Sequence, residues 1–133
     1  TLKASGAETA STTGADVTDA NLEKAEALLL VLDVTAQSGT VPTLDVVIQV
    51  KIGSLYYNLA RFALRGATTT KTALIVKRLT GFTTELTLES DPAVGTGVLN
   101  NDGAAWFDVL RYKSAITGTT PSYTYSVVAY PIK

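Results

Sequence analysis

The fold of this chain is decided by residues 28–51, which read LLLVLDVTAQSGTVPTLDVVIQVK. Residues 28–35 are an apolar run that ends in β-branched side chains, a pattern that predicts a buried strand. Residues 43–51 alternate, with Leu44, Val46 and Ile48 on one parity and mostly polar residues on the other. This period of two predicts a second strand with one buried face.

The segment before this stretch predicts little helix. Residues 18–27 contain cap-like residues and good helix formers, but they run directly into the apolar strand. We therefore expect a loop or one helical turn, followed by a strand from about Ala25. A helix over residues 19–30 is the alternative.

The remaining chain is predicted as strands between turns, because runs of β-branched and aromatic residues alternate with turn formers. The expected strands are residues 55–64, 72–77, 82–89, 104–112 and 122–130. The expected connections are residues 52–54, 66–70, 91–103 and 117–121, and no repeat of fixed period is evident. Within residues 55–64, the shared parity of Tyr56, Phe62 and Leu64 predicts one common face.

These elements predict an all-β protein. About seven to nine short strands separated by turns are typical of an antiparallel β-sandwich or jelly roll. Residues 1–18, rich in Ser, Thr and Ala, are expected to form an extended N-terminal arm or an edge strand. Residues 19–133 are expected to form a single β-sandwich domain.

The composition excludes most enzyme chemistry. The 133 residues contain no Cys, His or Met. Without Cys there are no disulfides, thiolate zinc sites or thiol nucleophiles, and without His the commonest general base is missing. We therefore expect a protein that is not an enzyme and that carries no cofactor and no metal.

The charge balance argues against two classes of partner. The net charge is −1, and only 17% of the residues are charged. Because the basic residues are scattered along the sequence, we expect no nucleic-acid binding. The longest apolar run is far shorter than a bilayer span, so we expect no membrane segment. Few charges on the surface favour a protein that is packed against other proteins.

Several carboxylates are candidates for catalysis. Glu85 and Glu89 share one strand face, and Asp91 follows them, but a solvent-facing role is the ordinary interpretation of that parity. Asp33 and Asp108 lie within apolar strands. A carboxylate there must be paired, so we expect each to meet an Arg or a backbone amide.

Two other patterns are candidate ligand-binding sites. Residues 100–103 read NNDG and offer oxygen ligands, as do Asp16 and Asp19, but turn chemistry explains them without calcium. Trp106 and the six tyrosines could form a carbohydrate platform. Because tyrosine also suits half-buried strand positions, core or subunit-interface packing is the favoured interpretation and glycan binding is not favoured.

Two long segments resemble a known class of proteins. Residues 30–36 (LVLDVTA) with 39–49 (GTVPTLDVVIQ), and residues 120–129 (TPSYTYSVVA), resemble small structural proteins of tailed bacteriophage virions. The Tyr56–Tyr57 pair, the strand at residues 106–111 and the small-residue start at 4–14 also fit. Residues 49–53 (QVKIG) depart from the resemblance, because they are more apolar than the G-K-D expected at that hairpin.

The resemblance implies a β-sandwich decoration or cement protein on the outer head surface of a virion assembled in the host cytoplasm. The implied partners are the major capsid protein and copies of the chain itself, as trimers in many head decoration proteins. The alternatives are a carbohydrate-binding β-sandwich module and a tail- or neck-associated virion protein.

We predict that the capsid or subunit contacts come from the N-terminal arm and from the loop at residues 91–103. We expect a partner to order the arm, because its small polar residues cannot form a core alone. The candidate contact residues are Leu2, Lys3, Glu8, Asp16, Asp91, Asn100, Asn101 and Asp102.

Overall fold

The described part of the chain folds as a single open β-sheet with almost no helix, which confirms the all-β prediction. The computed structural model describes residues 1–76, 98–100 and 109–132. Its strands are β1 (Lys3–Glu8), β2 (Val17–Thr18), β3 (Ala27–Ile52), β4 (Leu55–Arg65), β5 (Thr70–Val76), β6 (Val98–Asn100) and β7 (Val109–Ile132). The order across the sheet is β1-β7-β3-β5-β6; β2 also pairs with β7, and β4 with β3. All pairings are antiparallel except that of β5 with β6.

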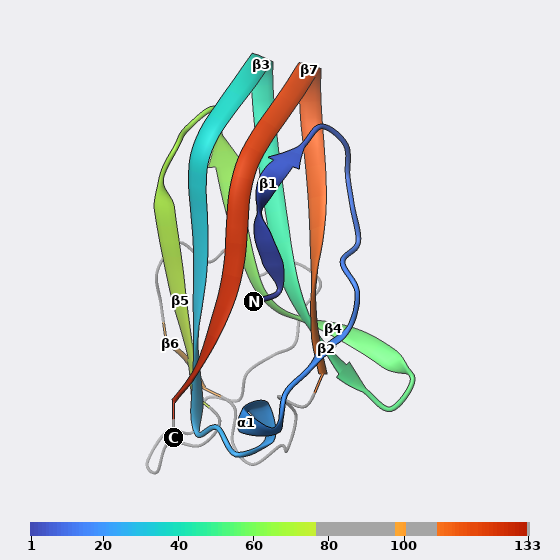
Figure 1. The fold of residues 1–133 in the computed structure, drawn as a ribbon, viewed down its shortest axis with the longest axis vertical. Helices are drawn as coiled ribbons and strands as arrows, with labels where there is room; N and C mark the ends of the chain where they lie inside the picture. The colour runs from blue at the N-terminus through green and yellow to red at the C-terminus, as the bar shows by residue number, and fades with distance from the viewer. Residues whose placement is uncertain (77–97, 101–108, 133) are drawn as a thin grey trace.

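β3 and β7 are far longer than the short strands expected from the sequence. They span 26 and 24 residues and pair with each other from Ala27↔Ile132 to Val50↔Leu110. In Figure 1, β3 rises on the left, bends at the top and descends on the right, and β7 follows the same path in the opposite direction. The predicted strands at 28–35 and 43–51 are therefore the two halves of β3, and the predicted turn at 117–121 is a bend within β7.

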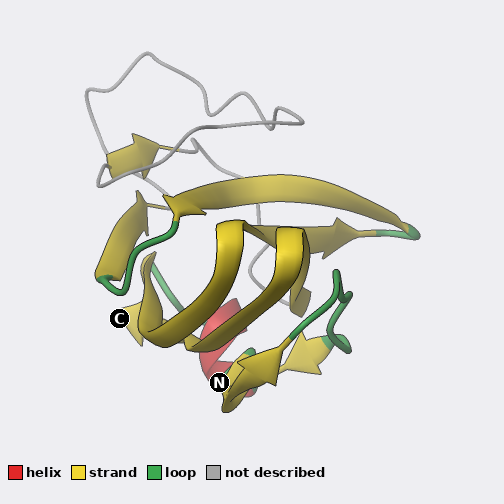
Figure 2. Cartoon of the chain, turned by 90° about the horizontal axis from the view of Figure 1, so that it is seen from above, coloured by secondary structure: helices red, strands yellow, loops and turns green. Residues whose placement is uncertain are grey.

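The bend has an internal symmetry that no fixed-period repeat indicated. We call residues 38–43 of β3 and 117–122 of β7 the corner; they contain the same G-T-x-P motif, at residues 39–42 and 118–121. Thr40 pairs with Thr119 at equivalent positions of the two motifs. The flanking pairs Ser38↔Ser122 and Thr43↔Thr117 are also equivalent, because Ser38 corresponds to Thr117 and Thr43 to Ser122. The two bends lie side by side when seen from above (Figure 2).

Register shifts at the corner determine which side chains face the core. From Val34 to Leu44, β3 advances ten residues while its partner advances nine, from Tyr125 to Ile116. Side chains alternate between the two faces of a strand. Two residues separated by an even number of positions therefore face the same side, and two separated by an odd number face opposite sides. The buried positions of β3 are even-numbered on both sides of the corner, whereas those of β7 change from Leu110, Tyr112 and Ile116 to Tyr123, Tyr125 and Val127.

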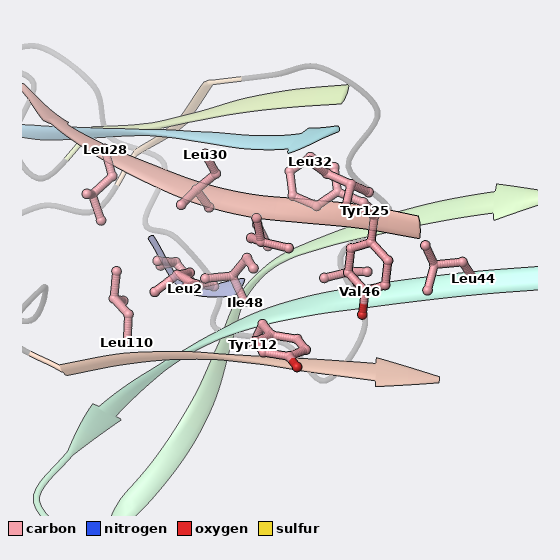
Figure 3. Close-up of a cluster of buried hydrophobic side chains, with 14 of the residues drawn as sticks. Leu2, Leu28, Leu30, Leu32, Leu44, Val46, Ile48, Leu110, Tyr112 and Tyr125 are labelled. Atoms are coloured by element: carbon pink, nitrogen blue, oxygen red, sulfur yellow. The ribbon is translucent and has the colours of Figure 1, made fainter. Parts of the chain in front are cut away.

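The core lies between the two halves of the bent sheet. Leucines of the first half of β3 face Leu44, Val46 and Ile48 of the second half, and Tyr112 and Tyr125 of β7 close the cluster (Figure 3). β4 adds its alternate residues from Ala60 to Leu64. Burying large apolar side chains in this way supplies most of the favourable free energy of folding.

The predicted face of β4 is wrong for Tyr56, which lies on the opposite side of the strand. Tyr56 was expected beside Phe62 and Leu64, but a bulge at Leu59 separates the pairs Ile48↔Ala60 and Gln49↔Asn58. The extra residue reverses the parity, so the Tyr56 side chain lies on the outer face near Asp16.

The short helix agrees with the favoured prediction. α1 (Ala20–Glu23) begins at Asp19, whose carboxylate accepts a hydrogen bond from the backbone N–H of Asn21 at 2.8 Å. The alternative helix over residues 19–30 does not form, because β3 begins at Ala27 and there pairs with both β5 and β7.

The N-terminal residues lie against the chain's own sheet. We call residues 1–18 the strap, because β1 pairs with the second half of β7 while Thr12, Gly14 and β2 bond to the first half. The strap thus crosses the open edge between the two halves of the bent strand (Figure 1). The expectation that a partner orders this segment is wrong for β1, since β7 supplies its hydrogen-bonding strand.

Candidate contact surfaces

The first two predicted contact residues are used within the fold. Leu2 is buried, and its backbone N–H donates to the carbonyl of Val127 at 2.9 Å. The Lys3 ammonium donates to the carbonyls of Gly6 and Tyr125 at 2.9 and 3.0 Å and lies 4.2 Å from the centre of the Tyr125 ring. Burial lowers the pKa of Lys3 below its ordinary value, although nearby Glu8 opposes the shift.

Glu8 joins the strap to both halves of β7. Its carboxylate accepts hydrogen bonds from the hydroxyls of Tyr112 at 2.8 Å and Ser114 at 3.0 Å on the first half. It also accepts a hydrogen bond from the Tyr125 hydroxyl on the second half. Burial, reinforced by Glu8, raises the pKa of Tyr112 to about 12 and that of Tyr125 well above its ordinary value. We call these four residues the carboxylate clamp.

Asp16 joins the end of the strap to the β3–β4 hairpin. Its carboxylate accepts a hydrogen bond from the Tyr56 hydroxyl at 2.8 Å and lies 3.2 Å from the Lys51 ammonium. The Tyr56 hydrogen bond, with the nearby Lys51, holds the pKa of Asp16 below its ordinary value. Asp16 is half-exposed, so it is available at the surface as well as bonded within the chain.

The loop candidates fall mostly beyond the described residues. Asn100 ends β6, which runs parallel to β5. Asp91, Asn101 and Asp102 lie outside the described residues. So do the catalytic candidates Glu85, Glu89 and Asp108 and the carbohydrate-binding candidate Trp106.

Asp33 has a partner, but not the expected one. Its carboxylate accepts a hydrogen bond from the Thr70 hydroxyl at 2.8 Å, across the β3–β5 pairing. The sequence placed Asp33 correctly within an apolar strand, yet the neighbouring strand that supplies its partner could not be identified without the register.

Three of the six tyrosines lie in the core. Tyr123 and Tyr125 are fully buried and Tyr112 is 7% exposed. Tyr56 is half-buried beneath the guanidinium of Arg111, which lies 3.3 Å from the ring centre. Tyr130 is exposed, at the end of the chain. A carbohydrate platform needs several exposed rings, and these positions do not provide one.

A polar network that the sequence did not indicate covers the outer face of β4 and of the adjacent halves of β3 and β7. Asp45 lies 3.2 Å from Arg61 and 3.1 Å from Arg65. Gln49 accepts a hydrogen bond from Arg111 Nε at 2.8 Å and donates one to Asn58 at 2.8 Å. The outward parity of Asp45 and Gln49 was visible in the sequence, but their partners depend on strand pairing.

A shallow hollow of about 220 Å³ opens in this network. Its walls are Asp45, Val47, Gln49, Asn58, Lys113, Ser114 and Ala115. Among the described residues, no group of three or more acidic side chains is arranged to hold a metal ion. In the same part of the chain, no helix is long and apolar enough to cross a membrane.

No family model, curated protein or solved structure matches the chain.

Proposed function

We propose that the chain is a non-enzymatic virion structural protein, a decoration or cement protein that binds the outer surface of a bacteriophage head. The proposal rests on where the segments that resemble phage structural proteins lie in the fold. The two segments that resemble phage structural proteins, residues 30–49 and 120–129, are neighbouring strands that meet at the corner. The likeness thus falls on the framework of the molecule, which is the part that related chains must share.

We further propose that the bent sheet works as a β-sandwich or jelly roll of two layers. The inward side chains of both halves of β3 and β7 support this, since they pack in one cluster between the halves. The carboxylate clamp and the pairing of the strap with both halves of β7 then hold one open edge together. Such a unit is stiff enough to hold neighbouring capsid subunits in a constant geometry.

The mechanism we propose is burial of surface across the boundaries of major capsid subunits. A stable interface needs roughly 1,000 Å², and many symmetric copies add avidity to modest single contacts. The exposed side chains of β1, which include Ala4, Ser5 and Ala7, are small and leave the edge of the sheet accessible for such a contact.

The proposal is tested by co-sedimentation of the purified chain with heads of the phage that encodes it, with light scattering to give the oligomeric state in solution. We expect saturable binding at a fixed number of copies per head and a rise in the temperature at which the heads break. Binding to isolated tails instead would place the protein at the tail or neck. Binding to a glycan array without binding to heads would favour the carbohydrate-binding module.

Because Leu2 and Glu8 support the fold, removing the strap would also destabilise the protein. A loss of head binding would then not distinguish a lost contact from unfolding. A sharper variant is Ala7→Arg, which changes an exposed side chain of β1, with Ser38→Arg at the exposed corner as its matched control. If β1 forms the contact, A7R loses head binding while S38R retains it, and both melt near the wild-type temperature.

A further inference from the structure

The outer face of β4 and of the adjacent halves of β3 and β7 gathers positive charge. It presents five cationic side chains: Lys51, Arg61, Arg65, Arg111 and Lys113. Asp16 and Asp45 are the two carboxylates among the described residues of this face, so these seven side chains together carry a formal charge of +3. The whole chain carries −1, so all its other residues together carry −4. We call this surface the basic face.

Most of its cationic groups are held in place before any partner arrives. Arg61 and Arg65 converge on Asp45, at 3.2 and 3.1 Å. Arg111 is fixed both by Gln49 and by the Tyr56 ring, over which it stacks. Arginine side chains that are already ordered lose less conformational entropy on binding, and arginine and tyrosine are enriched in protein–protein interfaces.

The basic face also offers an unpaired cation beside a hollow. Lys113 is exposed, and within the described part of the chain its ammonium has no side-chain partner. It lines the 220 Å³ hollow, and the other lining residues are Asp45, Val47, Gln49, Asn58, Ser114 and Ala115. A carboxylate beside Lys113 would gain an ion pair, and a small apolar side chain would fit above Val47.

We propose that the basic face binds an acidic protein surface. Charge complementarity is the reason: a surplus of cations on an otherwise acidic chain attracts and orients a partner rich in Asp and Glu. The carboxylate of Asp45 and the hydrogen-bonded amides of Gln49 and Asn58 suit a partner that offers both donors and acceptors. A nucleic acid offers an unbroken row of phosphates, which Asp45 repels. The identification of the partner as a capsid surface rests on the proposed function. The inference that the partner is acidic does not.

The inference is tested with Lys113→Glu and Arg65→Glu, whose side chains are exposed, and with Lys24→Glu at the exposed end of α1 as the matched control. The probes are fluorescent poly-L-glutamate, poly-L-lysine and duplex DNA, each measured by anisotropy at low and physiological salt. We expect poly-L-glutamate to bind best. K113E and R65E should each weaken that binding roughly three- to tenfold, as expected for reversal of one interfacial charge, while K24E changes it little.

The proposal is overturned if poly-L-glutamate binds no better than poly-L-lysine, if K24E weakens binding as much as K113E, or if duplex DNA binds more tightly than poly-L-glutamate. Phage heads separate this inference from the proposed function. If the wild type binds heads and K113E and R65E bind equally well, the inference fails and the function stands. If the wild type ignores heads but binds poly-L-glutamate through Lys113, the function fails and the inference stands.

Discussion

Gly39 and Gly118 occupy equivalent positions in the corner, and each lies against the backbone of the other's strand. A Cβ atom on Gly39 would lie 2.8 Å from the carbonyl oxygen of Thr120, and one on Gly118 would lie 3.0 Å from that of Val41. Their φ angles are +111° and +125°, a region that side chains rarely adopt. The bend of both long strands therefore depends on two glycines that are distant in sequence.

Gly39→Ala and Gly118→Ala should each destabilise the fold. Both the backbone angle and the contact with the opposite backbone are unfavourable to a Cβ, so we expect a loss of at least about 2 kcal/mol in the free energy of unfolding. Gly53→Ala is the control, because its φ is +64° and an added Cβ meets nothing within 4 Å. Urea denaturation should show a loss of only about 1 kcal/mol for G53A; equal losses at all three sites would contradict this account of the corner.

Val41→Asn should stabilise the protein. Val41 is 80% exposed and has a φ of +49°, a conformation that is costly for a β-branched residue and well tolerated by asparagine. We expect a gain of about 0.5–1 kcal/mol in urea denaturation. Val47→Asn, at an outward position in the straight part of β3, is the control and should bring no gain. A loss of stability in V41N would show that the valine side chain has a stabilising contact.

Glu8→Gln should weaken the carboxylate clamp. Two tyrosine hydroxyls and one serine hydroxyl donate to a charged acceptor in the wild type, and hydrogen bonds to a charged group are worth about 1.5–3 kcal/mol each. Because the amide retains one acceptor, we expect a net loss of roughly 1–3 kcal/mol. Hydrogen exchange should show faster opening of β1, and Glu26→Gln, at an exposed carboxyl, should leave these rates unchanged.

The clamp also predicts a loss of stability at alkaline pH. The pKa of Tyr112 is about 12 in the folded protein and ordinarily 10.0, so the unfolded chain releases this proton first. Stability is therefore complete below about pH 10 and falls as the pH rises towards 12, since the folded state then binds more protons. Tyr125 acts in the same direction. In Tyr112→Phe, the free energy of unfolding should fall less steeply between pH 10 and 12; an unchanged slope would refute the coupling.

Leu30→Ala should strongly destabilise the fold. Leu30 is fully buried between the two halves of the sheet, and truncating such a leucine costs about 2–5 kcal/mol through lost burial and a residual cavity. Leu55→Ala is the control, because Leu55 is 59% exposed, and it should change stability by less than about 0.5 kcal/mol. Thermal and urea unfolding of both variants measure the difference.

Alternation predicted the inward residues of straight strand segments well. Leu44, Val46 and Ile48 are buried as expected. This succeeded because the period of two is a property of each strand alone. It failed for Tyr56, since the bulge at Leu59 is defined only by the pairing of β4 with β3. It also divided β3 and β7 at the corner, because glycine and proline there signal a turn while cross-strand pairing continues through the bend.

The candidate contacts were harder to predict for the same reason. Glu8 is 104 and 117 residues from Tyr112 and Tyr125 along the chain. The five cations of the basic face come from three strands, and their spacing in sequence made them look scattered.

By itself, the sequence determined the β class, through alternation and turn residues, and excluded thiol and imidazole chemistry, because the chain contains no Cys and no His. The tertiary structure alone decided that two strands bend together at Gly39 and Gly118, that Glu8 fastens the strap, and that arginines from different strands converge on one face. The physical reason is the range of the interactions: residue type and alternation are local, whereas register and the contacts between distant strands exist only once the sheet has formed.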